Sequence, residues 1–324
     1  MLTFVTGATG LVGNNVVRLL LERGQAVRVL ARDSSDPRPL AGLDVEIVRG
    51  DVRDQEAVRT AMEGVGQIVH AAAHVHIGWT GEAIARQINV EGTRHVAEAA
   101  RAQGARMVHV STIDTLGLPA RKQVADEESP PTNGLLCPYV VTKREAEQVV
   151  LVAIAAGLDA VIVNPSYMLG PWDWKPSSGR ILLHVARNRA LFAPLGRNNY
   201  CDVRDVAAGI LSAAERGATG RRYILGGDTL NYFQAWRIFA RVTGSWPPLF
   251  PAGPLVRIGA GWCGDAWTKL SGHEPDLNSA ATAISAQSRH FTSARAQAEL
   301  GYRWRGLREA AEAAWQWFKQ NGYA

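Results

Sequence analysis

The sequence predicts an α/β fold, a doubly wound parallel sheet with a smaller C-terminal lobe, on two observations. Over the first two-thirds of the chain, short apolar runs alternate with longer segments of helical periodicity. Strands of this kind are typical of parallel sheets that helices cover on both faces. After about Pro165, proline, glycine and tryptophan become frequent, as in residues 170–176, which indicates a less regular lobe.

The individual elements follow from the same patterns. Short apolar runs mark buried strands, and apolar spacings of three and four residues mark helices. The predicted strands are residues 2–5, 26–30, 45–48, 67–71, 107–110 and 160–163. The predicted helices are residues 11–23, 83–103, 139–156, 203–216, 232–243 and 307–320.

Composition argues against several classes of function. The 324 residues carry a net charge of +5, and no run of lysine or arginine concentrates it, so nucleic-acid binding is not expected. Cys137, Cys201 and Cys263 are far apart and show no CxxC spacing. They predict neither a disulfide framework nor a metal site.

Stable membrane insertion is not expected either. The most apolar stretch, residues 149–157, is shorter than the ~20 residues that span a bilayer. The first predicted strand begins at Leu2 and leaves no room for a signal peptide, so we expect a cytoplasmic protein. Residues 255–270 have the pattern of an amphipathic or buried helix, in which Asp265 and Lys269 favour core packing or a lid over a substrate entrance.

A glycine-rich loop follows the first predicted strand and opens the first predicted helix. Gly7 allows a tight turn, Gly10 lets the backbone approach a pyrophosphate, and Gly13 lets the helix pack closely on the sheet. The phosphates would then meet free N–H groups at the positive end of the helix. The loop predicts a dinucleotide site, and Thr9, Leu11 and Val12 complete it.

The second strand indicates which dinucleotide is preferred. A cation at the tip of this strand accommodates a 2′-phosphate, whereas an acidic residue binds the ribose 2′-hydroxyl. Arg32 occupies the tip and Arg38 lies near it, so NADP(H) is favoured over NAD(H), although Asp33 could face the ribose instead. Asp51 and Val52 follow the third strand and suit the adenine edge.

A tyrosine and a lysine four residues apart open the helix 139–156. Residues at this spacing share a helix face, so the Lys143 ammonium can lie beside the Tyr139 phenol and lower the pKa of that phenol from ~10. Tyr139 would then act as an acid or base. Thr112, or alternatively Ser111, lies at the tip of the preceding strand and would hold the substrate oxygen.

Together these motifs resemble the extended short-chain dehydrogenases/reductases, the NAD-dependent epimerase/dehydratase superfamily, and most of all its dihydroflavonol reductase and 3β-hydroxysteroid dehydrogenase branch. The TGATGLVG loop, VSTIDTLG at 110–117, YVVTK at 139–143 and Asn164-Pro165-Ser166 stand in the family's order. The resemblance implies a Rossmann fold and a homodimer through helices 83–103 and 139–156. It implies that the cofactor also contacts Ala71, Ala72, Ala73, Lys143, Pro165 and Ser166.

The resemblance also implies how the chain divides into domains and which class of reaction it catalyses. Residues 1–165 would form the dinucleotide-binding domain, with a return near 195–225, and residues 166–324 would mainly form a substrate-binding lobe. Tyr139, Lys143 and Thr112 would reduce a carbonyl with NADPH, or oxidise the alcohol in reverse. An NAD-dependent sugar epimerase is the alternative, and a non-catalytic NADP(H)-binding sensor is a third hypothesis.

A reductase is favoured over an epimerase by Arg32 and by the composition of the predicted lobe. Aromatic and apolar walls suit a hydrophobic carbonyl compound better than a diphosphate sugar. The residues expected to contact this small-molecule substrate are His74, Tyr167, Trp172 and Tyr200.

Overall fold

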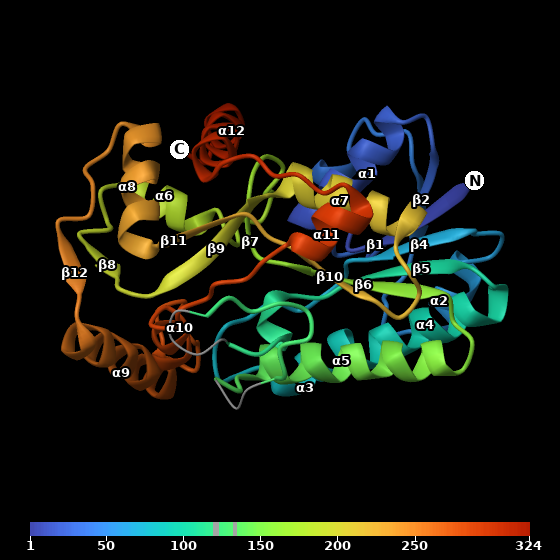
Figure 1. Cartoon of the computed structure of the whole chain (residues 1–324), viewed down its shortest axis with the longest axis horizontal. Helices are drawn as coiled ribbons and strands as arrows, with labels where there is room; N and C mark the ends of the chain where they lie inside the picture. The colour runs from blue at the N-terminus through green and yellow to red at the C-terminus, as the bar shows by residue number, and fades with distance from the viewer. Residues whose placement is uncertain (119–122, 132–134) are drawn as a thin grey trace.

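The computed structural model describes residues 1–118, 123–131 and 135–324, and in this part of the chain a seven-stranded parallel sheet forms the centre (Figure 1). The strand order is β10-β6-β5-β4-β1-β2-β3, which confirms the predicted doubly wound α/β fold. The strands are β1 (Leu2–Thr6), β2 (Ala26–Ala31), β3 (Glu46–Arg49), β4 (Gln67–His70), β5 (Arg106–Val110), β6 (Ala160–Pro165) and β10 (Arg222–Leu225).

Helices cover both faces of this sheet. On one face lie α1 (Leu11–Glu22), α7 (Val203–Arg216) and α11 (Ala294–Leu300). On the other face lie α2 (Gln55–Ala61), α4 (Gly92–Gln103) and α5 (Pro138–Ala155). The predicted helix 83–103 is a continuous run of α3 (Glu82–Ala85), the π-helix η2 (Arg86–Glu91) and α4. Short 3-10 turns are η1 (Arg38–Leu40) and η3 (Ile113–Thr115).

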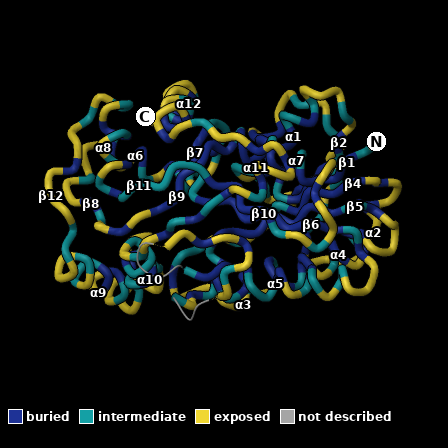
Figure 2. The backbone as a smooth tube through the Cα atoms, in the orientation of Figure 1, coloured by how far each residue is buried: buried dark blue, intermediate teal, exposed yellow. Residues whose placement is uncertain are grey.

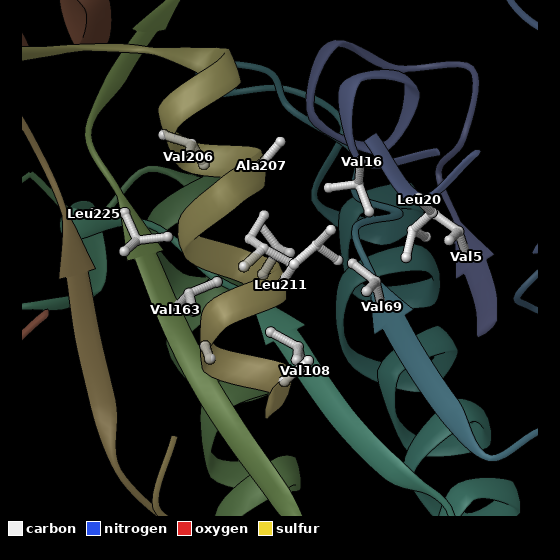
Figure 3. Packing of buried hydrophobic residues seen from close by; sticks show 14 of the residues in the cluster. Val5, Val16, Leu20, Val69, Val108, Val163, Val206, Ala207, Leu211 and Leu225 are labelled. Carbon is white, nitrogen blue, oxygen red and sulfur yellow. The ribbon is translucent and has the colours of Figure 1, made fainter. Parts of the chain in front are cut away.

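The core between the sheet and its first helical face is almost entirely aliphatic. Figure 3 shows Val16 and Leu20 of α1 and Val206 and Leu211 of α7 packed over the strands. The strand residues beneath them are Val5, Val69, Val108, Val163 and Leu225, one from each of β1, β4, β5, β6 and β10. Removing these side chains from water, at roughly 25 cal/mol per Å² of apolar surface, stabilises the sheet and fixes its carboxyl edge in place.

The C-terminal half adds a lobe beyond the β10 side of the sheet, at the left of Figure 1. Its small sheets are β7 (Tyr167–Leu169), β9 (Arg197–Asp202) and β11 (Asp228–Asn231), and separately β8 (Phe192–Pro194) with β12 (Phe250–Ala252). The helices α6 (Arg180–Ala186), α8 (Tyr232–Thr243) and α12 (Leu307–Gln320) share one aromatic-rich core. The remaining helices are α9 (Pro254–Ser271) and α10 (Ser279–Ile284).

The ends of α8 show why the sequence predicts this helix well. The Asn231 side chain accepts a hydrogen bond from the Gln234 N–H at 2.7 Å, and the Gln234 side chain accepts one from the Asn231 N–H at 3.1 Å. This capping box satisfies two backbone donors at the start of the helix. Gly244 ends the helix with a φ of 72°, a conformation that glycine adopts at little cost.

Helix α9 differs from its prediction. Its buried residues are Gly261 and Gly264, whereas Leu255, Trp262 and Leu270 are 88%, 70% and 86% exposed. The expectation of core packing for this segment is therefore wrong, as the exposed and intermediate colours along α9 in Figure 2 also show. No helix among the residues that the structure describes has the length and hydropathy needed to cross a membrane.

Candidate active site

The site forms at the carboxyl edge of the sheet, where the strand order reverses around β1. Open α/β sheets bind ligands in the crevice at such a point. Gly7 follows β1 and Ala71 follows β4, so these two neighbouring strand ends frame the crevice. A Cβ atom on Gly7 would lie 2.6 Å from the Ala71 carbonyl oxygen, and Gly7 has a φ of +71°. Both the space and the backbone conformation therefore require glycine here.

The rest of the loop keeps its backbone donors accessible. Gly10 is the N-cap of α1 and carries no side chain that could cap the helix, so the first N–H groups of α1 lack a side-chain acceptor. A Cβ on Gly13 would collide with the Gly7 carbonyl, so glycine is needed for α1 to start this close to the loop. These features fit a pyrophosphate, which binds backbone N–H groups at a helix N-terminus.

Three arginines that follow β2 and β3 differ in whether their side chains form ion pairs. Arg38 forms an ion pair with Asp36 at 2.6 Å, and Arg53 forms one with Asp51 at 2.8 Å. Arg32 is exposed directly after β2, and no hydrogen bond or ion pair of its side chain occurs within the described ranges. The hydrogen bond from Arg53, and more weakly the charge of Arg32, lower the pKa of Asp51. Of these three arginines, Arg32 is the one whose guanidinium pairs with no carboxylate in the described part of the chain.

The three predicted catalytic side chains lie on two adjacent elements of this edge. Tyr139 and Lys143 are buried on the first turns of α5, which starts at Pro138, and Thr112 follows β5. The Lys143 Nζ donates to the Val110 carbonyl oxygen at 2.9 Å. The Thr112 hydroxyl donates to the Asp114 Oδ2 at 3.0 Å and accepts from the Asp114 N–H at 3.2 Å. Helix α5 is therefore fixed against the strand that carries Thr112.

Burial dominates the electrostatics of this trio. It raises the pKa of Tyr139, the charge of Asp114 raises that pKa further, and a hydrogen bond with Thr112 lowers it. Burial also lowers the pKa of Lys143 to about 8, although the Glu147 carboxylate opposes this shift. The structure thus differs from the expected acidic phenol, because desolvation disfavours the phenolate. Tyr139 is a protonated donor at neutral pH.

Ser111, the alternative to Thr112, has its hydroxyl bound to a buried carboxylate. Its hydroxyl donates to Glu147, whose carboxylate also accepts from the Thr115 hydroxyl at 2.7 Å and the Asn164 amide at 2.8 Å. Arg222 of β10 pairs with the other oxygen of Glu147 at 3.0 Å. The sequence interpretation missed Glu147, although its position four residues after Lys143 continues the Tyr139 face of α5.

The sequence interpretation also missed an ion pair next to Thr112. The Arg289 guanidinium lies 2.6 Å from Asp114, and both side chains are largely buried, at 9% and 13% exposure. The Arg289 N–H donates to the Arg197 carbonyl oxygen of β9, so this arginine belongs to the C-terminal lobe. The two partners are 175 positions apart in the chain, and no local pattern could have revealed the contact.

Three of the four expected substrate residues, Tyr167, Trp172 and Tyr200, share the aromatic-rich core of the C-terminal lobe. Tyr167 and Tyr200 contact each other, with ring centroids 5.4 Å apart, but Tyr200 is only 1% exposed. Trp172 packs against the same core and also lies under the Arg18 guanidinium of α1, which is 3.3 Å from its ring centroid. His74 follows β4 near the crevice, where its N–H donates to the Asn89 side chain at 2.7 Å. Burial, and to a lesser extent the charges of His76 and Lys175, lowers the pKa of His74.

The remaining predicted cofactor residues lie along the same edge. Ala72 and Ala73 follow β4, and the Ala72 N–H donates to the Thr6 hydroxyl at 3.2 Å. Pro165 ends β6, the neighbour of β5, and Ser166 follows it. The loop glycines, these residues and Thr112 therefore follow the carboxyl ends of β1, β4, β5 and β6. Tyr139 and Lys143 come from α5, and the hydrogen bond of Lys143 to Val110 holds them at the end of β5.

A seven-stranded Rossmann-type sheet with this loop and this Tyr-Lys pair defines an enzyme of the extended short-chain dehydrogenase/reductase class. The chain belongs to the NAD dependent epimerase/dehydratase family, whose model matches residues 3–226. It is 35% identical over 327 residues to a dihydroflavonol 4-reductase-like protein of Synechocystis sp., covering 99% of this chain and 95% of that one.

Two further relatives match over the whole chain. Sterol demethylase protein B of Methylococcus capsulatus is 34% identical over 330 residues, covering 99% of both chains. The crystal structure of gox2253 is 34% identical and superimposes with a TM-score of 0.88 over 99% of both chains. The family predicted from the motifs is confirmed, and so is its nicotinamide-dependent enzyme class.

Proposed function

We propose that this protein is an NADP(H)-dependent reductase that converts a ketone or aldehyde into an alcohol. The observation that carries the proposal is the buried pair Tyr139 and Lys143, one helical turn apart on α5, with Thr112 just after β5. Burial raises the pKa of Tyr139, which keeps its phenol protonated at neutral pH. A protonated phenol is the form that can donate a proton to a carbonyl oxygen.

Each member of the trio has a distinct task. When bound, NADPH supplies the hydride for the carbonyl carbon. Tyr139 donates a proton to the carbonyl oxygen, and Thr112 holds that oxygen in position. The Lys143 ammonium stabilises the phenolate that remains and binds the cofactor ribose. In the oxidative direction, Tyr139 accepts the proton of the alcohol.

The cofactor would be held along the edge of the sheet. The loop donors of α1 would bind the pyrophosphate, and Arg32 would bind a 2′-phosphate, since its guanidinium is uncommitted where Arg38 and Arg53 are paired. The proposed cofactor residues are Gly7, Thr9, Gly10, Leu11, Val12, Arg32, Asp51, Val52, Ala71, Ala72, Ala73, Tyr139, Lys143, Pro165 and Ser166.

We infer a hydrophobic or aromatic substrate bound mainly by residues 166–324. The names of the dihydroflavonol reductase-like and sterol demethylase relatives agree with such a compound. The burial of Tyr200 and the cover of Arg18 over Trp172 favour packing roles for these two aromatics, and leave His74 and Tyr167 as the stronger substrate candidates. A homodimer through the run α3–η2–α4 and through α5 also belongs to this proposal.

A sugar epimerase is the second candidate, because the family that the chain belongs to contains epimerases. An epimerase retains NAD and returns the hydride to the same substrate, so a free arginine at the 2′ position has no task in it. The intact Thr112, Tyr139 and Lys143 argue against a non-catalytic sensor.

The substitution Tyr139→Phe tests the proposal. It should lower the rate of NADPH oxidation with a reactive carbonyl by at least ~1,000-fold, because the proton donor is lost, and leave the Kd for NADPH within about twofold. The rate is followed by NADPH absorbance and the Kd by fluorescence titration. Tyr323→Phe, near the C-terminus, is the matched control. Turnover that persists in the Tyr139 variant would refute the assignment.

A further inference from the structure

A buried carboxylate joins the C-terminal lobe to the loop that follows β4. Glu274 lies in the turn between α9 and α10, and its side chain is only 3% exposed. Its oxygens accept the Trp79 N–H at 2.8 Å, the Thr80 N–H at 2.9 Å and the Thr80 hydroxyl at 2.6 Å. The His76 Nε2 lies 2.8 Å from the same carboxylate. One short loop therefore surrounds a side chain that stands 194 positions after Thr80.

The burial of Glu274 depends on these donors. A buried carboxylate is costly unless hydrogen bonds or a cation compensate it. Among the described residues, no lysine or arginine side chain forms an ion pair with Glu274. Burial raises the pKa of Glu274, but the hydrogen bonds of Thr80, Trp79 and His76 outweigh this effect and lower that pKa to about 2. The observed position of the loop is therefore the one in which this charge is compensated.

Further contacts align the two segments. The Asn278 side chain donates to the Ile77 carbonyl oxygen at 2.9 Å. Gly78 is buried, and a Cβ atom there would collide with the Glu274 carboxylate, so the loop could not approach this closely with a larger residue. The turn between α9 and α10 thus lies directly against residues 76–80 of the loop.

The same loop borders the catalytic tyrosine. It comprises residues 71–81 between β4 and α3, and it includes His74, one of the proposed substrate residues. Ile77 of the loop packs in one apolar cluster with Tyr139 and with Ala280, the second residue of α10. Figure 1 shows α10 on the same side of the molecule as α3 and α5. A shift of the loop would therefore change the surroundings of the catalytic phenol.

The start of the loop is fixed to α5 by other contacts. The Asn89 amide donates to the His74 carbonyl oxygen at 3.1 Å and to the Thr142 hydroxyl at 3.0 Å. Thr142 is on α5, directly before Lys143. The start of the loop is thus tied to the catalytic helix, whereas residues 76–80 are held by the turn between α9 and α10. Loss of the contacts with that turn would free the far part of the loop and leave its start in place.

We propose that Glu274 is a positioning residue for the substrate, which holds residues 76–80 against the active site so that they form one wall of the space beside Tyr139. A carbonyl compound that contacts this wall binds more weakly once the wall is released, while the proton donor stays in place. The effect on the substrate rests on the proposed reductase function. The attachment of the loop by Glu274 does not.

Amide hydrogen exchange of the full chain, without substrate, tests the attachment. Thr80→Val removes the hydroxyl that donates to Glu274, and Thr80→Ser keeps it. Exchange within residues 76–80 should be at least ~10-fold faster in Glu274→Gln and in Thr80→Val than in the native chain, because the loop then opens more often. It should remain native in Thr80→Ser. It should also remain native in the control Asp276→Asn, since Asp276 is in the same turn but forms an exposed ion pair with Arg180.

Steady-state kinetics test the effect on the substrate. With NADPH and a hydrophobic carbonyl compound that the native chain reduces, the KM for that compound should rise at least ~5-fold in Glu274→Gln and Thr80→Val, with kcat and the Kd for NADPH unchanged within about twofold. Thr80→Ser and Asp276→Asn should keep the native KM. Native exchange rates in Glu274→Gln, or faster exchange with an unchanged KM, would overturn the proposal. If the native chain reduces no carbonyl compound, the proposed function fails, and the exchange rates still decide whether Glu274 holds the loop.

Discussion

At the residue scale, the site is a set of buried groups whose protonation is set by burial. The motif YVVTK could be predicted to place Tyr139 and Lys143 on one face of a helix, and the structure has them on the first turns of α5. Their pKa values could not be predicted, because the depth of burial and the Asp114 carboxylate come from distant parts of the chain. A sequence shows which groups share a helix face but not how much water reaches them.

The pKa of Lys143 predicts how the rate of the reaction depends on pH. Burial lowers the pKa of Lys143 to about 8, so its positive charge is present at neutral pH and is lost as the pH rises through that value. The reductive kcat/KM should therefore fall tenfold per pH unit above about pH 8. Lys143→Arg retains the charge, so the alkaline fall should move to higher pH even if the maximal rate is lower. An identical pH profile in the two proteins would contradict this role.

At the element scale, α5 is the helix that joins the site to the sheet. The strand and helix pattern of the chain predicted α5, α7, α8 and α12 within one residue of their observed ends. The side chains of Asp202 and Asn231 cap α7 and α8, and Pro138 stands in the first turn of α5. The pattern failed for α9, since a helical period does not say which side faces the protein. It also did not reveal that Glu147 joins Ser111, which follows β5, to residues of β6 and β10.

Glu147→Ala should therefore destabilise the whole domain. The variant leaves Arg222 and the Asn164 amide without their buried acceptor, a loss of about 3 kcal/mol in the free energy of unfolding. Urea denaturation measures this difference. Glu145→Ala on the same helix removes an exposed ion pair with Arg86 and should cost less than about 1 kcal/mol. Equal stabilities for the two variants would refute the structural role of Glu147.

At the scale of the whole molecule, the C-terminal lobe and the sheet meet at the active site through Asp114 and Arg289. The overall architecture could be predicted, because alternating strands and helices define it and the glycine loop marks where the crevice lies. The relation between the lobe and the sheet could not, because it depends on contacts between segments that are far apart in the sequence. Arg289 brings the lobe to the residue that also accepts the Thr112 hydroxyl.

The contributions of Asp114 and Arg289 to the free energy of unfolding should be strongly coupled. Arg289→Gln leaves the Asp114 carboxylate largely buried without its partner and should cost about 3 kcal/mol of unfolding free energy. Adding Asp114→Asn should recover a substantial part of that loss. The exposed pair Arg308–Glu312 is the control, for which a double-mutant cycle should give no more than about 0.5 kcal/mol. Additive losses at Asp114 and Arg289 would show that the lobe is not held there.

The central claim is that hydride passes between a nicotinamide cofactor and a separate carbonyl substrate at Tyr139. Incubation with NADPH deuterated at the transferred position, followed by mass spectrometry of the products from a panel of hydrophobic ketones and aldehydes, tests it most directly. The account predicts one deuterium on the carbinol carbon of the product, with stoichiometric formation of NADP⁺, and much less transfer from deuterated NADH. No labelled alcohol from any carbonyl, together with tightly bound NAD in the purified protein, would contradict it and favour an epimerase.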